Sequence, residues 1–145
     1  MPTIDYQLVV PYRLLPVGFR PCLAVRVTGP RDYVDLVAHV DSGSYHVVFD
    51  GQTAKAIGLN LTDGEYKGLQ SSRGVIHARL HDVTLEVEGY RFPCRVAFTE
   101  EHIVRPLLGR TGFFDLWQIG FRERVSEMYL SPDPHAPELT PPGVT

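Results

Sequence analysis

The stretch Ala38–Ser44, which reads AHVDSGS, places an aspartate, two hydroxyl residues and a glycine between two apolar runs. Runs rich in apolar and β-branched residues predict buried strands, so the polar residues inside this one need an explanation. Two interpretations are open. Asp41 either caps a tight turn by accepting backbone N–H groups, or it is a catalytic carboxylate at the mouth of a cavity.

The residues before Asp41 alternate with the period of a strand. Successive side chains of a strand point to opposite faces, which gives two sets of four residues. One face carries Val34, Leu36, Ala38 and Val40, and the other carries Asp35, Val37, His39 and Asp41. Asp41 is therefore expected where the strand ends, with Gly43 free to adopt the backbone conformation of the following turn.

The rest of the chain shows the same alternation and little helical periodicity. Strands are predicted for Tyr6–Val10, Cys22–Thr28, Tyr33–Val40, Val75–Val87 and Tyr90–Thr99, followed by a hairpin of Gln118–Phe121 and Val125–Leu130. Two short helices are expected, at Gln52–Ile57 before Gly58 and at Thr111–Leu116. Many short strands separated by turns predict an all-β fold, a small closed β-barrel, because closure removes exposed strand edges.

The composition indicates one folded domain, residues 1–130, and a different C-terminal segment. Residues 131–145 (SPDPHAPELTPPGVT) contain five prolines and almost no large apolar side chain. Such a segment offsets little of its ordering entropy by burial, so we expect a flexible, proline-rich tail. A proline-rich docking motif for a partner is the alternative.

Charge and hydropathy limit the classes of function. The net charge of −3 over 145 residues argues against a nucleic-acid partner, which requires clustered basic residues. The sequence has no apolar run long enough for a membrane span and no signal-peptide pattern at its start, so no membrane partner is expected and the cytoplasm is the expected location. Cys22 and Cys94 lie in apolar alternating runs and are expected to be buried, reduced thiols.

A second motif favours the catalytic interpretation of Asp41 over the turn cap. Leu107-Leu108-Gly109-Arg110 follows Asp41 by about seventy residues, and together with Val40-Asp41-Ser42-Gly43-Ser44 it resembles the retropepsin-like family of aspartic proteases. The resemblance covers roughly Pro21 to Leu130. It departs from the family pattern at Ser42, where threonine is commoner, and at His39 and Tyr45, which are larger and more polar than the usual neighbours. His39 and His46 are interpreted as pocket-lining or surface residues.

This resemblance implies an acid-protease barrel with a flap hairpin and assigns roles to residues. It implies Asp41 as the catalytic residue and Ser42, Gly43 and Ser44 as support of the catalytic loop. Leu107, Leu108, Gly109 and Arg110 are implied to pack behind that loop. The flap is implied within KGLQSSRGVIHARL, with its tip at Ser71–Gly74 and with substrate-binding residues Gly68, Ser71, Ser72, Arg73, Gly74 and Val75.

One aspartate is not sufficient for this chemistry. Aspartic proteases use two carboxylates that share a proton, because like charges at close range cannot both ionise. Asp41-Ser42-Gly43 occurs once, and Asp50-Gly51 and Asp63-Gly64 do not repeat it. The expected active form is a homodimer with Asp41 of each subunit on the two-fold axis, acting on a peptide or protein substrate. The alternative is a catalytically silent dimer that binds peptides or serves assembly.

Other chemistries receive less support. His77 and His81 are predicted on one strand face roughly 13 Å apart, too far to share a metal ion, so no metal site and no cofactor are expected. Ser42 and Ser44 lack the Gly-x-Ser-x-Gly context of a nucleophilic serine.

Overall fold

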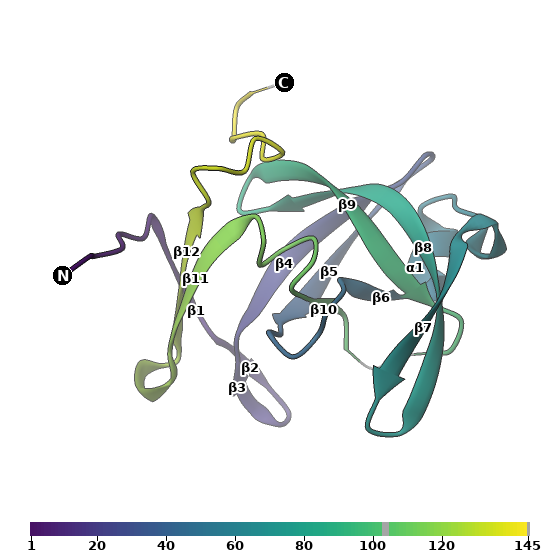
Figure 1. The fold of residues 1–145 in the computed structure, drawn as a ribbon, viewed down its shortest axis with the longest axis horizontal. Coiled ribbons are helices and arrows are strands. Elements are labelled where there is room, and N and C mark those ends of the chain that lie inside the picture. The colour runs from purple at the N-terminus through teal and green to yellow at the C-terminus, as the bar shows by residue number, and fades with distance from the viewer. Residues whose placement is uncertain (103–104, 145) are drawn as a thin grey trace.

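The computed structural model describes residues 1–102 and 105–144, which form a β-barrel flanked by a small sheet (Figure 1). Strands make up most of it, with one α-helix and two 3-10 helices. In chain order the elements are β1 (Leu8–Pro11), β2 (Arg13–Leu15), β3 (Gly18–Arg20), β4 (Cys22–Thr28), β5 (Tyr33–Val40), β6 (Val48–Asp50), α1 (Gly51–Ala56), η1 (Leu61–Asp63), β7 (Glu65–Ser71), β8 (Gly74–Val87), β9 (Tyr90–Thr99), β10 (Leu107–Leu108), β11 (Trp117–Arg122), η2 (Glu123–Val125) and β12 (Glu127–Pro132).

The barrel closes through the long strand β8. The main sheet has the order β4-β5-β10-β6-β9-β8-β7, and an additional antiparallel pairing of its first strand β4 with β8 closes the strands from β4 to β8 into a ring, with β7 left at the edge. β8 therefore has two neighbours in succession on one side, since its first half pairs with β7 and its second half with β4. The predicted all-β closed barrel is confirmed.

Alternation explains the core. In β4 the buried residues Val25 and Val27 alternate with exposed ones, and in β5 the inward face ends in the buried Ala38 and Val40. The three-stranded sheet β1-β12-β11 covers one side of the barrel and contributes Met128 and Leu130 to the same core. Both cysteines are buried and free, as expected.

Helix α1 forms as predicted. The Asp50 side chain accepts a hydrogen bond from the Gln52 N–H at 2.8 Å, which caps the first turn. The helix ends before Gly58, whose positive φ of 92° breaks the helical geometry. Among the described residues, no helix is long and apolar enough to cross a membrane.

The second predicted helix, Thr111–Leu116, is wrong. This segment is a succession of turns. Gly112 has a φ of 104°, which right-handed helical residues do not adopt, and the N–H groups of Phe114 and Asp115 donate to the carbonyl groups of Gly109 and Arg110, five residues back. The turns press Gly112 against the core, where an added Cβ would lie 2.8 Å from the Cys94 sulfur.

The terminal elements differ in detail from the prediction. The strand expected at Tyr6–Val10 runs from Leu8 to Pro11, and Val125 belongs to η2. The tail boundary expected at Ser131 falls later, because β12 continues to Pro132. Beyond it, Ala136 and Leu139 pack against the core and Thr140 exchanges two backbone hydrogen bonds with Arg91, so this part of the tail contacts the barrel.

Candidate active site

Asp41 lies directly after β5, where two other segments hold the backbone. β10 runs parallel to β5, with Leu107 beside His39 and Leu108 beside Val40. The Asp41 N–H donates to the Leu108 carbonyl at 3.0 Å, and the Val40 N–H donates to the Pro21 carbonyl at 2.9 Å. The end of the strand is thus paired on both sides, which fixes the position of the carboxylate.

The loop after Asp41 is a tight turn capped by the aspartate. The Gly43 N–H donates to Asp41 Oδ1 at 2.8 Å, and the Ser44 N–H donates to the Asp41 carbonyl at 3.2 Å. Asp41 is partly buried, whereas Ser42 and Gly43 are exposed. The Ser44 hydroxyl donates to the His46 carbonyl at 2.7 Å, so it holds the loop in place. The turn-capping interpretation of Asp41 is therefore physically correct, and it leaves Oδ2 without a hydrogen bond to the described part of the chain.

The Leu107–Arg110 segment packs behind this loop, as the resemblance implied. The Arg110 N–H donates to the Ser44 carbonyl and the Thr111 N–H to the Tyr45 carbonyl, both at 2.8 Å. A Cβ on Gly109 would lie 2.0 Å from the His46 carbonyl oxygen and 2.6 Å from that of Ser44. Only glycine fits between these backbones, which explains the glycine of the second motif.

Asp41 opens onto a cleft of about 550 Å³. Its walls come from the Asp41 loop, from β6 and β10, and from the hairpin of β7 and β8, which projects from the barrel in Figure 1. The lining residues are Asp41, Gly43, Ser44, Tyr45, His46, Val48, Lys67, Gly68, Leu69, Gln70, Ser71, Ile76 and Leu107. Asp41 is the one carboxylate among them.

The β7–β8 hairpin turns at the position expected for the tip. Ser71 pairs with Gly74, so Ser72 and Arg73 form the turn, and Gly74 has a φ of 110°. The Ser71 hydroxyl donates to the Gly74 carbonyl at 2.8 Å and accepts from the Arg73 N–H at 3.2 Å. The seryl side chain therefore stabilises the turn at its base.

The structure brings together only part of the predicted set. Asp41, Gly43, Ser44, Gly68, Ser71 and Leu107 line the cleft. Leu108 and Gly109 support it from behind, whereas Ser42, Arg110, Ser72, Arg73, Gly74 and Val75 do not line it. Sequence reasoning had not assigned Tyr45, Val48, Lys67, Leu69, Gln70 and Ile76, and alternation does not indicate the residues of β7, because five successive residues, 67–71, line the cleft.

The floor of the cleft is apolar. Val48, Ala78 and Ala97 form a small buried cluster, against which Leu69, Leu80 and Leu107 pack. Leu69 and Ile76 lie opposite one another in the β7–β8 pairing and share the face that lines the cleft. An extended peptide could place an apolar side chain against this surface.

Two histidines near Asp41 are disfavoured as cations. Burial lowers the pKa of His46, and the charge of Lys67 lowers it further. Burial likewise lowers the pKa of His39, with contributions from Arg105 and Arg20, while the Asp41 charge acts in the opposite direction. His46 lines the cleft and His39 is half-buried beside it, consistent with the pocket-lining interpretation.

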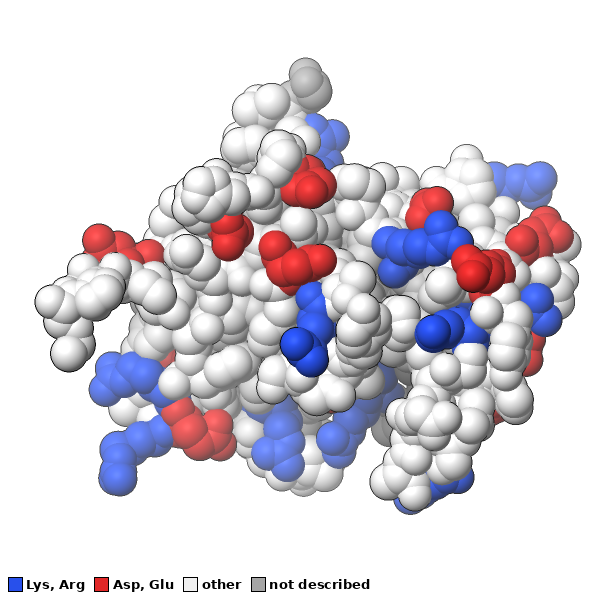
Figure 2. Space-filling view, viewed as in Figure 1, with Lys and Arg blue, Asp and Glu red and all other residues white. Residues whose placement is uncertain are grey.

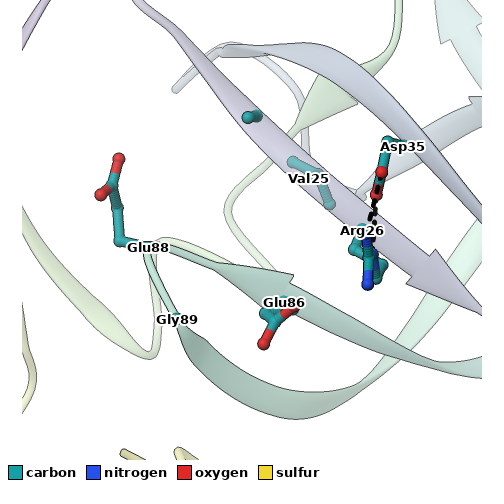
Figure 3. Close-up of a pocket in the computed structure, with 7 residues that line it drawn as sticks. Val25, Arg26, Asp35, Glu86, Glu88 and Gly89 are labelled. Atoms are coloured by element: carbon teal, nitrogen blue, oxygen red, sulfur yellow. Dashed lines mark hydrogen bonds and ion pairs between the residues drawn. The ribbon is translucent and has the colours of Figure 1, made fainter. Parts of the chain in front are cut away.

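A second hollow, of about 450 Å³, lies between β4 and β8 (Figure 3). Its charged residues include Arg26 and Asp35, which form a two-point ion pair at 2.8 and 3.0 Å, with the guanidinium 4.0 Å from the centre of the Tyr33 ring. The Arg26 hydrogen bonds lower the pKa of the Asp35 carboxyl group. Asp35 is on the same face of β5 as Asp41, about 20 Å away at the rise of a strand, and its charge is already neutralised.

Comparison with known proteins shows which fold the chain has. No protein-family model and no curated protein sequence matches the chain. Among solved structures, it is similar to a retropepsin-like aspartic protease from Rickettsia conorii, with a TM-score of 0.59 and 12% sequence identity, over 90% of this chain and 96% of that chain. At this identity the likeness concerns the fold. The chain has the β-barrel fold of a retropepsin-like aspartic protease.

Proposed function

We propose that the protein is an aspartic endopeptidase that acts as a homodimer. One observation carries the proposal: Asp41 stands at the mouth of a peptide-sized cleft beneath a hairpin, in a barrel shared with a retropepsin-like aspartic protease. Each subunit supplies one Asp41, so the site is complete only in the dimer. The two loops approach one another across the two-fold axis.

The chemistry follows from two carboxylates that share a proton. The ionised Asp41 accepts a proton from a water molecule as its oxygen attacks the scissile carbonyl carbon, and the protonated Asp41 of the partner subunit donates to the carbonyl oxygen. In the collapse of the tetrahedral intermediate, the Asp41 that took the proton of the water donates it to the departing nitrogen, the partner's Asp41 takes back a proton from a hydroxyl of the intermediate, and the C–N bond breaks. The pair titrates as one unit, with no pKa belonging to either residue.

The β7–β8 hairpin serves as a flap in this proposal. Its backbone offers hydrogen-bonding groups to an extended peptide, which adds to the sheet as a further strand. Closure of the hairpin excludes water during the reaction, and opening releases the products. Gly68 and Gly74 give the hairpin the backbone freedom for this motion.

The alternative function is a dimeric peptide-binding or assembly module without catalysis. The Gly43 N–H bond to Asp41 Oδ1 favours it, because an aspartate that caps its own turn has a structural role even in a protein with no catalytic site. The family resemblance is broken at Ser42, His39 and Tyr45, and these departures also favour the non-catalytic alternative.

The experiment compares wild type with Asp41→Asn and with the matched control Asp35→Asn on the same face of β5. Wild type should cleave members of a peptide library with an acid-leaning pH dependence and be blocked by a statine-type inhibitor. Asp41→Asn should lose cleavage while light scattering shows an unchanged dimer, and Asp35→Asn should retain it.

Two outcomes would contradict the proposal. Cleavage retained by Asp41→Asn would remove Asp41 from catalysis, and a strictly monomeric wild type could not assemble the pair. If folded wild type cuts no peptide but binds some as tightly as Asp41→Asn does, the binding module is the correct function.

A further inference from the structure

Basic residues lie in the wall of the cleft and beside His39, on the strand that leads to Asp41. On the hairpin side, Lys67 lines the cleft. Lys67 lies opposite the fully buried Ala78 in the β7–β8 pairing and so shares its face, which means that the lysine stem crosses the apolar wall. The ammonium group then lies at the cleft, close enough to His46 to disfavour protonation of that ring.

Arg20 and Arg105 flank the strand that carries Asp41. His39 pairs with Cys22 of β4 and with Leu107 of β10. Arg20 lies two residues before the first of these partners and Arg105 two residues before the second. His39 itself lies two residues before Asp41 on the same face, a spacing of about 7 Å. Both arginines and Asp41 act electrostatically on the His39 ring.

In the part of the chain that the structure describes, these three cations have no acidic partner. Within residues 1–102 and 105–144, Lys67, Arg20 and Arg105 form no ion pair. Arg26, Arg79 and Arg95 on the barrel wall each have a carboxylate within 3.0 Å. In Figure 2 the coloured side chains over the β2–β3 hairpin of Figure 1 are blue, so this part of the surface is basic.

The local charge of the site is opposite to that of the chain. The net charge is −3, but charges farther away than about 8 Å are largely screened at physiological ionic strength. The cations at the cleft and beside His39 therefore determine which ligand is attracted. An approaching carboxylate meets Lys67 and the apolar floor in the cleft, and Arg20 and Arg105 beside His39 on the strand that leads to Asp41.

We propose that the site selects peptides that carry a glutamate or aspartate side chain next to an apolar one at the cleaved bond. The inference rests on the proposed function and names its substrate class. Lys67 and the Arg20–Arg105 pair are the specificity-determining residues, and Val48, Leu69 and Leu107 receive the apolar side chain.

The test uses three peptides that are identical except for Glu, Gln or Lys on either side of an apolar pair. Binding to Asp41→Asn is measured by fluorescence anisotropy, and kcat/KM by cleavage with wild type. The Glu peptide should be preferred over the Gln peptide about fivefold, and the Lys peptide should be the poorest, because partly exposed ion pairs contribute up to about 1 kcal/mol. The Glu preference should shrink in 1 M salt and vanish below about pH 4, where the peptide carboxyl groups become protonated.

The triple variant Arg20→Gln/Lys67→Gln/Arg105→Gln is made in the Asp41→Asn background. It should bind the Glu and Gln peptides equally while still binding the Gln peptide as Asp41→Asn alone does, which shows that the cleft is intact. Lys55→Gln, which removes a lysine from α1, is the matched control and should keep the preference. The inference is overturned if Asp41→Asn binds the Glu and Gln peptides alike, if wild type cleaves both at the same rate, or if the preference survives in the triple variant.

The outcomes separate the two proposals. If wild type cleaves all three peptides at similar rates, the endopeptidase stands and the substrate class is wrong. If Asp41→Asn prefers the Glu peptide but wild type cleaves none, the recognition stands and the endopeptidase is wrong.

Discussion

At the scale of residues, Asp41 shows why one motif is ambiguous. Its Oδ1 accepts the Gly43 N–H, as in many ordinary turns, so the tripeptide alone does not distinguish a cap from a catalyst. The distinction comes from Gly109, which packs so closely against the Ser44 and His46 carbonyl groups of the Asp41 loop that a Cβ has no room. Both motifs can be recognised in the sequence. The fold shows that the second motif packs behind the first, so that the two form one structural unit.

Gly109 supplies a prediction about this unit. Gly109→Ala should lower the free energy of unfolding by about 3 kcal/mol, because its Cβ would overlap two carbonyl groups that belong to backbone. Urea unfolding measures the loss. Gly68→Ala is the control: its Cβ would lie 3.1 Å from the Val75 side chain, which can move, so it should cost less than about 1 kcal/mol. Equal losses would contradict the argument.

His46 gives a prediction on pH. Burial and Lys67 lower its pKa in the folded chain, so between the folded and unfolded pKa values the unfolded chain binds a proton that the folded chain does not. The free energy of unfolding therefore falls as the pH falls through this window. Between about pH 7 and pH 5, wild type should lose more stability than His46→Gln, measured by urea unfolding at both values. The same pH dependence in both proteins would show that this histidine is not responsible.

At the scale of elements, strands with clear alternation were predictable and very short ones were not. β4 and β5 appear with the expected bounds, because seven or eight residues repeat the pattern. β10 has two residues and β6 three, so neither contains a period that a sequence could reveal. Lys67 was missed as a cleft residue for a related reason, since its position depends on how β7 folds over β6 and β10.

The C-terminal segment carries an element-scale prediction. Its proline content indicated an unpacked tail, yet Leu139 packs against the core and Thr140 pairs with Arg91. Leu139→Ser should lower the free energy of unfolding by about 1–2 kcal/mol and the melting temperature by several degrees, because a partly buried apolar side chain is lost. Glu138→Ser, an exposed neighbour, should have almost no effect in the same thermal melt. Identical melting of both variants with wild type would mean that the segment adds no stability.

At the scale of the whole molecule, the sequence could predict that the barrel closes, but it could not predict which strands pair to close it. An all-β chain of this length has strand edges to satisfy, which favours a ring. The particular pairing of β4 with β8 depends on the length of β8 and on how the sheet coils, which are properties of the assembled sheet.

Cys94 reports on the integrity of this ring. It is a core residue of β9, and burial raises the pKa of its thiol to about 12. The thiolate is the reactive form, so Cys94 should react with a thiol reagent only when the barrel opens. In a Cys22→Ser background, labelling followed by mass spectrometry should proceed at the rate of global unfolding and accelerate with urea. Fast labelling in the absence of urea would mean that the barrel opens locally at β9.

The pairing of β4 with β8 also bears on solubility. An open sheet of this size would present two unpaired edges to other chains, and such edges promote aggregation. In the ring the edge at β4 is paired with β8, so the open edge of the main sheet is β7, whose hairpin lines the cleft at Asp41. The closure that covers the β4 edge therefore leaves an open edge next to the site where the proposed function places an extended substrate.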